Sequence, residues 1–260
     1  MAAAQIKAKI ISNQRLQGNY WHLEFESGLI ARQALAGQFV NIRVAAGLEP
    51  LFRRPFSIHG VKASKVKIIY EILGKGTCLL AARKPGELLD IIGPLGKGFN
   101  YSLSAKSAQG KNILIAGGLG VAPLVFLAEK LKLSQPLILI GAKTKRQLLG
   151  EKEFKALGCE VKIATDDGSR GFKGQATDLL KRWLAANCHR PAAIYSCGPH
   201  LMLKAVAQIA GENKIAAQLS LERHLACGIG ACLGCVVMTK DGYKTVCQDG
   251  PVFSSEKLIW

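Results

Sequence analysis

The first hundred residues alternate between apolar and polar positions with a period of about two. Short runs rich in β-branched and aromatic residues are separated by Gly and Pro, which is typical of closely spaced antiparallel strands. Such strands close into a barrel or pack as a sandwich. One helical interruption is expected at Thr77–Arg83. The expected strands are 5–10, 20–26, 37–44, 56–60, 65–72 and 87–92.

From about Asn112 the pattern changes to apolar strand, turn and amphipathic helix. The strands are nearly continuous apolar runs, as in parallel strands that are buried on both faces. This alternation predicts a doubly wound parallel sheet. The expected strands are 112–118, 136–142, 160–167, 192–198 and 216–222, and the expected helices are 123–131, 151–157, 175–186 and 200–210.

These patterns predict a multidomain β plus α/β protein with two internal boundaries. A stretch rich in Ser, Ala and Gly at 102–111 separates the barrel from the sheet. The periodicity stops after Glu222, where a tail rich in Gly and Cys begins. We therefore expect an antiparallel β-barrel domain at 1–102, a Rossmann-like nucleotide domain at 108–222 and a small C-terminal region at 223–260.

The composition describes a folded chain with a strongly basic balance. Because 49% of the residues are apolar and only 20% are charged, a disordered chain is excluded. The net charge of +17 raises the possibility of nucleic-acid binding. However, no run of like charges exceeds two neighbours, and the excess is nearly absent from residues 223–260. A solvated basic surface is favoured, and a nucleic-acid-binding protein with a zinc tail is the non-enzymatic alternative.

No targeting or membrane segment is apparent. Lys7 and Lys9 interrupt the only apolar stretch near the amino terminus, so no signal-peptide core is present there. The longest uncharged stretch, 112–128, contains Gly and Pro and is shorter than a membrane span. We expect a cytoplasmic protein that binds neither membrane nor nucleic acid. In that compartment eight cysteines favour thiolate chemistry over disulfides.

Four cysteines are concentrated in the tail. Cys227, Cys232, Cys235 and Cys247 have the spacing C-x4-C-x2-C-x11-C, and its first two intervals match the plant-type arrangement for a [2Fe–2S] cluster. The Gly and Ala residues between them allow backbone N–H groups to turn toward the sulfurs. A structural zinc site, which usually uses two C-x2-C pairs, stays the alternative, although only Cys232 and Cys235 form such a pair.

A glycine-rich turn follows the first strand of the expected sheet. Glycines between a strand and a helix let the backbone approach a pyrophosphate at the helix N-terminus. This turn and the start of its helix predict part of a dinucleotide site, contributed by Gly117, Gly118, Gly120 and Pro123.

Two further strand ends support this site, because ligands gather at the carboxyl ends of such sheets. Asp166 and Asp167 could accept hydrogen bonds from a ribose and would repel a 2′-phosphate, which favours NAD over NADP. An ordinary Asp-Gly turn is the alternative. Cys197, Gly198 and Pro199 end the fourth strand, and Cys197 is the candidate to lie near the nicotinamide.

The expected barrel carries residues suited to a flavin. Arg54, Pro55, Phe56 and Ser57 combine a cation for phosphate, an aromatic face and a hydroxyl donor. A phosphate-binding turn at a helix start follows, and Tyr70 is counted with this set. That turn comprises Gly74, Lys75, Gly76 and Thr77.

The histidines show no metal-ligand spacing. We therefore expect each of them to be an ordinary structural or surface residue. They are His22, His59, His189, His200 and His224.

The order of these motifs resembles that of the ferredoxin–NAD(P) reductase superfamily over residues 1–222. The motifs are R-P-F-S, G-K-G-T, G-P-L-G-K-G-F, G-G-L-G-V-A-P, T-D-D-G and C-G-P. The tail, with C-G-I-G-A-C-L-G-C and a later V-C-Q-D-G-P-V-F, resembles that of the electron-transfer subunits of dihydroorotate dehydrogenase B. The resemblance covers essentially the whole chain, and the tail is its most discriminating part.

The resemblance implies FAD in the barrel, NAD at the sheet and a [2Fe–2S] cluster in the tail. Arg54 would bind the FAD pyrophosphate, Phe56 and Ser57 would face the isoalloxazine, and the turn at 74–77 would hold the phosphates. The superfamily often has Tyr in place of Phe56, so stacking is kept and the hydroxyl contact is lost. Members that use NADP carry Ser and Arg in place of Asp166 and Asp167, which again favours NAD.

The resemblance also implies a partner. That partner is an FMN-containing catalytic subunit that oxidises dihydroorotate to orotate in pyrimidine biosynthesis, assembled as a heterotetramer of two copies of each subunit. Electrons would pass from FMN through the cluster and FAD to NAD+. The enzymatic alternative is an NAD-linked diaphorase or ferredoxin reductase subunit of a hydrogenase-type complex.

Overall fold

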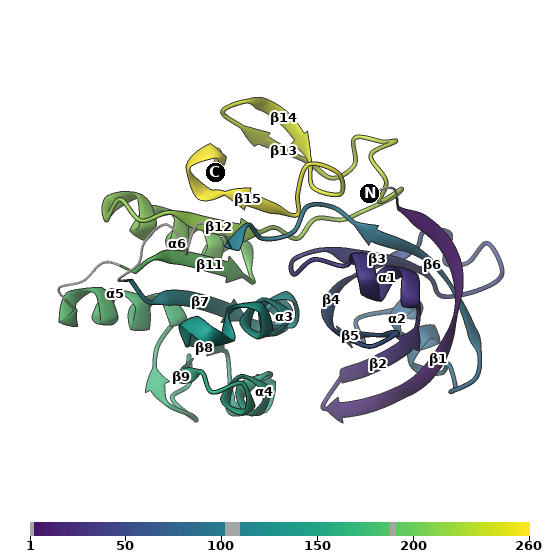
Figure 1. Ribbon diagram of the computed structural model, residues 1–260, viewed down its shortest axis with the longest axis horizontal. Coiled ribbons are helices and arrows are strands. Elements are labelled where there is room, and N and C mark those ends of the chain that lie inside the picture. The colour runs from purple at the N-terminus through teal and green to yellow at the C-terminus, as the bar shows by residue number, and fades with distance from the viewer. Residues whose placement is uncertain (1–2, 102–109, 188–190) are drawn as a thin grey trace.

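The computed structural model describes residues 3–101, 110–187 and 191–260. They form a β-barrel beside a mainly parallel α/β sheet, and the C-terminal tail lies along both (Figure 1). This architecture confirms the predicted fold class. Most of the expected linker, residues 102–109, lies outside the described residues, as do Cys188 and His189.

Six antiparallel strands close the barrel in the order β1-β2-β5-β4-β3-β6. The first strand continues seven residues beyond its expected end at Ile10. Helix α1 was not predicted, and it begins where the Ser27 hydroxyl accepts a hydrogen bond from the Ile30 N–H at 3.2 Å, as an N-cap residue does. The elements are β1 (Ala4–Gln17), β2 (Tyr20–Glu26), α1 (Gly28–Gln33), β3 (Phe39–Arg43), β4 (Arg54–Lys62), β5 (Lys65–Glu71), α2 (Lys75–Ala81) and β6 (Leu88–Leu95).

The second sheet has the order β10-β9-β8-β7-β11-β12-β15, and all its pairs except the last are parallel. The strand order reverses between β7 and β11, which is the point where doubly wound sheets bind ligands. The strands are β7 (Asn112–Gly117), β8 (Leu137–Ala142), β9 (Glu160–Thr165), β10 (Phe172–Lys173), β11 (Ala193–Cys197) and β12 (Ala217–Ser220), and the helices are α3 (Val121–Leu131), α4 (Glu151–Ala156), α5 (Ala176–Ala186) and α6 (His200–Glu212).

The tail contains more regular structure than its sequence predicts. Strands β13 (Val236–Thr239) and β14 (Gly242–Thr245) form a hairpin, and β15 (Val252–Ser254) extends the large sheet antiparallel to β12. These strands have only three or four residues each, too few for a visible alternation. The sequence pattern therefore did not predict these three strands.

Two hydrophobic clusters hold these parts together. In β7, Leu114 and Ala116 face a cluster that includes the barrel interior and helices α3 and α4, which lie between sheet and barrel (Figure 1). The alternate residues Ile113 and Ile115 face a cluster shared with α5, α6 and the tail. Since both clusters cross the expected domain boundaries, those boundaries stay a prediction.

His59 of β4 provides a polar link between barrel and sheet. Its side chain is 2% exposed, and its ring nitrogens lie 3.1 Å from the Ala122 carbonyl oxygen and 2.7 Å from Oε1 of Glu153. Each ring nitrogen thus lies within hydrogen-bond distance of an oxygen on a different helix. Desolvation acts to raise the pKa of Glu153, but its hydrogen bond to His59 and nearby positive charges lower it. The start of α3 is thereby fixed to the barrel.

The loops that follow β7 and β11 pack too closely for a side chain at Gly120, whose ideal Cβ would lie 2.0 Å from the Cys197 carbonyl oxygen. We expect Gly120→Ala to lower the free energy of unfolding by about 3 kcal/mol, because the two backbones must separate. Gly211→Ala in α6, where a Cβ meets nothing within 4 Å, should be neutral or slightly stabilising. Denaturant unfolding of both variants tests this; equal stabilities would contradict it.

Candidate functional site

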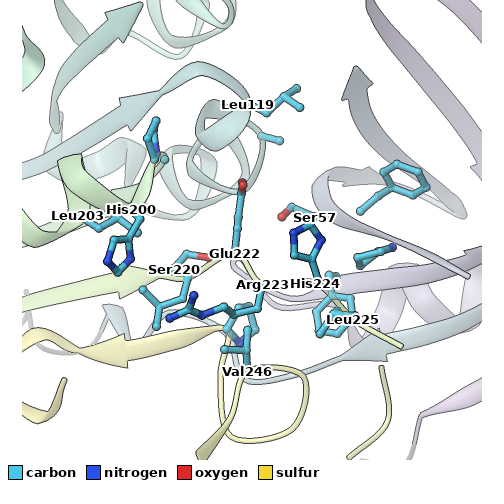
Figure 2. A pocket seen from close by; sticks show the side chains of 18 of the residues that line it. Ser57, Leu119, His200, Leu203, Ser220, Glu222, Arg223, His224, Leu225 and Val246 are labelled. Atoms are coloured by element: carbon cyan, nitrogen blue, oxygen red, sulfur yellow. The ribbon is translucent and has the colours of Figure 1, made fainter. Parts of the chain in front are cut away.

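A cavity of about 610 Å³ opens where the barrel, the carboxyl edge of the sheet and the tail meet. Its size suits a cofactor or a substrate. Figure 2 shows Ser57, Leu119 and Glu222 among the side chains around the cavity. The predicted site residues that line it are Arg54, Pro55, Phe56, Ser57, Tyr70, Thr77, Gly198 and Pro199. The remaining predicted site residues are not part of the cavity lining, and their positions are described below.

Two aromatic rings lie together in the barrel wall. The Phe56 and Tyr70 rings lie 5.6 Å apart in a tilted arrangement. The Tyr70 hydroxyl donates to Oδ1 of Asn13 at 2.8 Å, and burial raises the pKa of Tyr70. Its hydroxyl is thus committed to the barrel, so Tyr70 offers the cavity its ring.

Arg54 and the turn before α2 form the polar end of the barrel wall. The Arg54 guanidinium donates to the Phe52 carbonyl oxygen at 2.6 Å, and an ideal Cβ on Gly76 would lie 2.7 Å from its Nε. Glycine at position 76 therefore makes room for this cation. The Thr77 hydroxyl accepts the Gly74 N–H at 3.3 Å, which closes the turn.

Lys75 does not line the cavity. Its ammonium forms an exposed ion pair with Glu49. The Lys75 ammonium of the predicted phosphate-binding turn is thus paired with a carboxylate 26 residues earlier in the sequence.

At the sheet edge the two predicted nucleotide loops are in contact. An ideal Cβ on Gly117 would lie 2.7 Å from Cδ of Pro199, while Gly118 has φ +55° and nothing within 4 Å of its Cβ position. Gly117 and Gly120 thus allow the loops to pack, whereas Gly118 leaves open space where a ligand could approach. Pro123 is buried in the first turn of α3.

Asp166 and Asp167 follow β9, outside the cavity and exposed. Oδ1 of Asp167 accepts from the Ser169 hydroxyl at 2.6 Å and the Ser169 N–H at 2.9 Å, and these hydrogen bonds lower the pKa of Asp167. The Asp-Gly turn is therefore formed, and the Asp167 carboxylate stabilises it. Among the described hydrogen bonds, none involves the side chain of Asp166.

Cys197 and Glu222 are close neighbours at the ends of β11 and β12. The Cys197 thiol is buried, and burial followed by the Glu222 charge raises its pKa. It stays protonated and lies behind the cavity wall formed by Gly198 and Pro199. Glu222 is accessible from the cavity, and desolvation by the surrounding protein raises the pKa of its carboxyl.

The four tail cysteines form two pairs. Cys227 lies beside Cys232, and the Cys235 sulfur accepts the Cys247 N–H at 3.4 Å. The Ile229 N–H points to the Cys227 sulfur at 3.5 Å. Desolvation acts to raise the pKa of Cys227, but backbone hydrogen bonds lower it to about 6. The loop thus favours a thiolate.

This pairing bears on which metal the tail can hold. Within the described ranges, no three metal-binding side chains converge as a group that could hold a metal ion. A structural zinc ion needs all four ligands on one centre, whereas the two irons of a [2Fe–2S] cluster share the four cysteines. Two thiol pairs with N–H groups directed to sulfur therefore fit a two-iron cluster better than zinc.

Several cavity residues were not predicted. Glu222 could have been found because it is the last residue of the last predicted strand, 216–222, at the ligand-binding edge. His200 and His224 line the cavity, so for these two the expectation of an ordinary structural or surface role was incomplete. The Trp260 ring packs 5.1 Å from the His200 ring, and no sequence pattern links these two positions.

The barrel, the parallel sheet and the cavity between them define a flavin-dependent oxidoreductase of the ferredoxin–NADP reductase fold. A structure of an NADH-dependent reduced ferredoxin-NADP oxidoreductase superposes with a TM-score of 0.83 and 27% identity, covering 97% of this chain and 90% of that chain. The ferredoxin-NADP+ reductase of Plasmodium falciparum shares the fold, with a TM-score of 0.65 and 16% identity over 83% of this chain and 96% of that one. None of the described helices is long and apolar enough to cross a membrane.

The relatives narrow this class. Residues 222–259 match the iron-sulfur cluster binding domain of dihydroorotate dehydrogenase B. The chain is 39% identical to the electron transfer subunit of dihydroorotate dehydrogenase B (NAD(+)) from Desulforamulus reducens, over 97% of both chains. It is 38% identical to the Geobacillus kaustophilus subunit, over 96% of both. The chain belongs to this family of electron transfer subunits, and its cofactors are FAD, a [2Fe–2S] cluster and NAD.

The raised pKa of Glu222 predicts a pH-dependent stability difference. When folding raises the pKa of a carboxyl, its contribution to the stability of the folded protein is greatest below the pKa of the unfolded state. That contribution is lost as pH rises through the pKa of the folded state. Glu222→Gln should therefore gain stability relative to the parent chain from pH 5 to pH 8, on the order of 1–2 °C in Tm. Glu212→Gln, an exposed control on α6, should show no such trend. A pH-independent difference for Glu222→Gln would contradict this expectation.

Proposed function

We propose that this chain passes electrons from an FMN-containing partner subunit, which oxidises dihydroorotate to orotate, through the [2Fe–2S] cluster and FAD to NAD+. One observation carries the proposal: a single cavity is bounded by the flavin residues of the barrel, the nucleotide edge of the sheet and the segment that leads into the cluster loop. Leu225 lines this cavity, and Cys227 follows two residues later.

The numbers of electrons exchanged explain why FAD is needed between the cluster and NAD+. Oxidation of dihydroorotate to orotate releases two electrons and two protons, and NAD+ accepts two electrons and one proton, so one proton is released. When bound, FAD supplies the link, since a flavin exchanges both single electrons and hydride. This chain's residues then have to hold the groups close together and exclude water from the hydride step.

Individual residues divide this work. Arg54 would bind the FAD pyrophosphate through the attraction between its positive charge and the phosphate oxygens. Phe56 and Ser57 would face the isoalloxazine. Gly118 would admit the NAD pyrophosphate at the start of α3. Asp166 would bind the ribose and disfavour a 2′-phosphate, which supports the preference for NAD.

The cluster loop also supports a partner subunit. Ile229 and Leu233 lie between the predicted cluster ligands and are 51% and 77% exposed. Exposed apolar side chains beside a redox centre suit an interface that excludes water. We place the FMN subunit at this loop, in a heterotetramer of two copies of each subunit that serves pyrimidine biosynthesis.

A second candidate is favoured by the structural similarity to the NADH-dependent reduced ferredoxin-NADP oxidoreductase. In that function the same three cofactors would serve a ferredoxin or hydrogenase-type partner. The family membership supports the first candidate, because the Desulforamulus reducens and Geobacillus kaustophilus proteins, at 39% and 38% identity over nearly the full chain, are dihydroorotate dehydrogenase B subunits.

Co-purification tests the proposal and separates the two candidates. We expect the chain to carry about two irons and one FAD and to co-purify with an FMN protein that reduces NAD+ with dihydroorotate. Iron, sulfide and flavin analysis and the dihydroorotate–NAD+ assay are the measurements. A chain with zinc and no flavin would refute the proposal, and co-purification with a ferredoxin or hydrogenase instead would favour the second candidate.

The separation of cluster and flavin is tested by Cys232→Ser. We expect this variant to lose the cluster, since serine replaces a thiolate ligand, and to retain FAD and NADH oxidation with an artificial two-electron acceptor. Iron content and diaphorase assays measure both. Cys78→Ser is the control, because Cys78 is an exposed free cysteine of α2, and it should retain both cofactors. Loss of diaphorase activity together with the cluster would show that the two sites are not separable.

A further inference from the structure

Asn41 is a buried amide that joins the cluster loop to the barrel. Its side chain is 1% exposed, and its Nδ2 donates to the Cys227 carbonyl oxygen at 3.2 Å, across 186 residues of sequence. An ideal Cβ on Gly228 would lie 2.3 Å from this Nδ2. The cluster loop therefore packs with its backbone directly against the amide, and any side chain at position 228 would displace one of them.

The strand register connects this contact to the cavity. In the β3–β4 pair, Asn41 lies opposite Pro55 and Phe39 lies opposite Ser57. Phe39, Pro55 and Ser57 line the cavity. Directly opposed residues of an antiparallel pair have Cα atoms about 5 Å apart. The backbone of Cys227 is thus separated from the flavin-facing wall by one hydrogen bond and one strand spacing.

The stability of the barrel does not explain an amide at this position. Oδ1 of Asn41 is buried and has no hydrogen-bond partner among the residues that the structure describes. A buried polar atom without a partner costs free energy. An apolar side chain of similar size would avoid that cost, as Val40 and Ile42 do on the inward face of the same strand. The contact that distinguishes Asn41 is its hydrogen bond to the cluster loop.

We propose that Asn41 is a positioning residue for electron exchange between the cluster and the flavin. It holds the Cys227 end of the cluster loop against the β3–β4 wall, so that the separation of the two redox groups is fixed. The amide keeps its proton throughout, and each exchange moves one electron without breaking a bond of the chain. This inference rests on the proposed function.

The test compares Asn41→Leu with a matched control in the purified holo-complex. Asn112→Leu is the control: Asn112 is also 1% exposed, donates to the Ser134 hydroxyl at 3.1 Å and leaves its own Oδ1 without a described partner. It begins β7, at the end of the strand opposite Gly117. Iron and FAD content, the electron paramagnetic resonance spectrum of the reduced cluster and stopped-flow reduction by NADH are measured for both variants.

For Asn41→Leu we expect both cofactors to be retained and the flavin to be reduced by NADH at the parental rate. The subsequent transfer between flavin and cluster should be about tenfold slower, the effect of losing one positioning hydrogen bond, and the resonance spectrum should change. Asn112→Leu should match the parent in every measurement. A parental transfer rate and spectrum in Asn41→Leu would overturn the proposal.

A second variant tests the same contact from the other side. Gly228→Ala keeps the Asn41 side chain but forces the amide and the loop apart, and the φ of +72° at position 228 adds strain. It should slow the same step. If Asn41→Leu binds FAD but loses iron while Asn112→Leu keeps both, the amide serves to retain the cluster and not to position it for electron exchange, which would also overturn the proposal. Absence of flavin or iron from the parent complex would instead refute the proposed function before any variant is compared.

Discussion

The arrangement of the whole site depends on one antiparallel pair, β3 with β4. Its inward side chains, such as Val40 and Ile58, fill the barrel, so the pair cannot shift without opening the core. Its outward positions then make three separate contacts: Ser57 faces the cavity, Asn41 holds the cluster loop, and His59 bonds to the start of α3. Because a strand alternates its faces with a period of two, packing of the barrel interior fixes the positions of all three.

The tail is held from two sides, and this keeps the cluster loop in register with the cavity. Strand β15 pairs with β12, where Phe253 lies opposite Leu219. On the barrel side the Lys97 N–H donates to the Gly250 carbonyl oxygen at 2.5 Å. The surplus positive charge of the chain is consistent with this arrangement, since two dinucleotides and a cluster with four thiolates all add negative charge. The net charge of +17 therefore does not require a nucleic-acid partner.

Local patterns in the sequence were sufficient to predict the barrel, the parallel sheet and an iron–sulfur tail. Each depends on a periodicity or spacing within about 20 residues. Features that depend on distant contacts were missed or only partly predicted. Asn41 contacts Cys227 across 186 positions, and Lys75 forms an ion pair with Glu49. Strand β15 forms by pairing with the edge of β12. Glu222 is intermediate, because its place at the end of a predicted strand implied a position at the ligand-binding edge.

The glycine-rich turn after β7 shows why a motif is not read residue by residue. Gly117 and Gly120 are close to the loop after β11, with Cβ positions 2.7 Å from Pro199 and 2.0 Å from Cys197 respectively. These two glycines therefore serve the packing of strand ends. Among the three glycines of this turn, Gly118 alone combines a positive φ with open space at its Cβ position. The packing glycines bring the β11 loop against α3, and this contact places Gly198 and Pro199 in the cavity wall. The nucleotide site thus depends on glycines that need not touch the nucleotide.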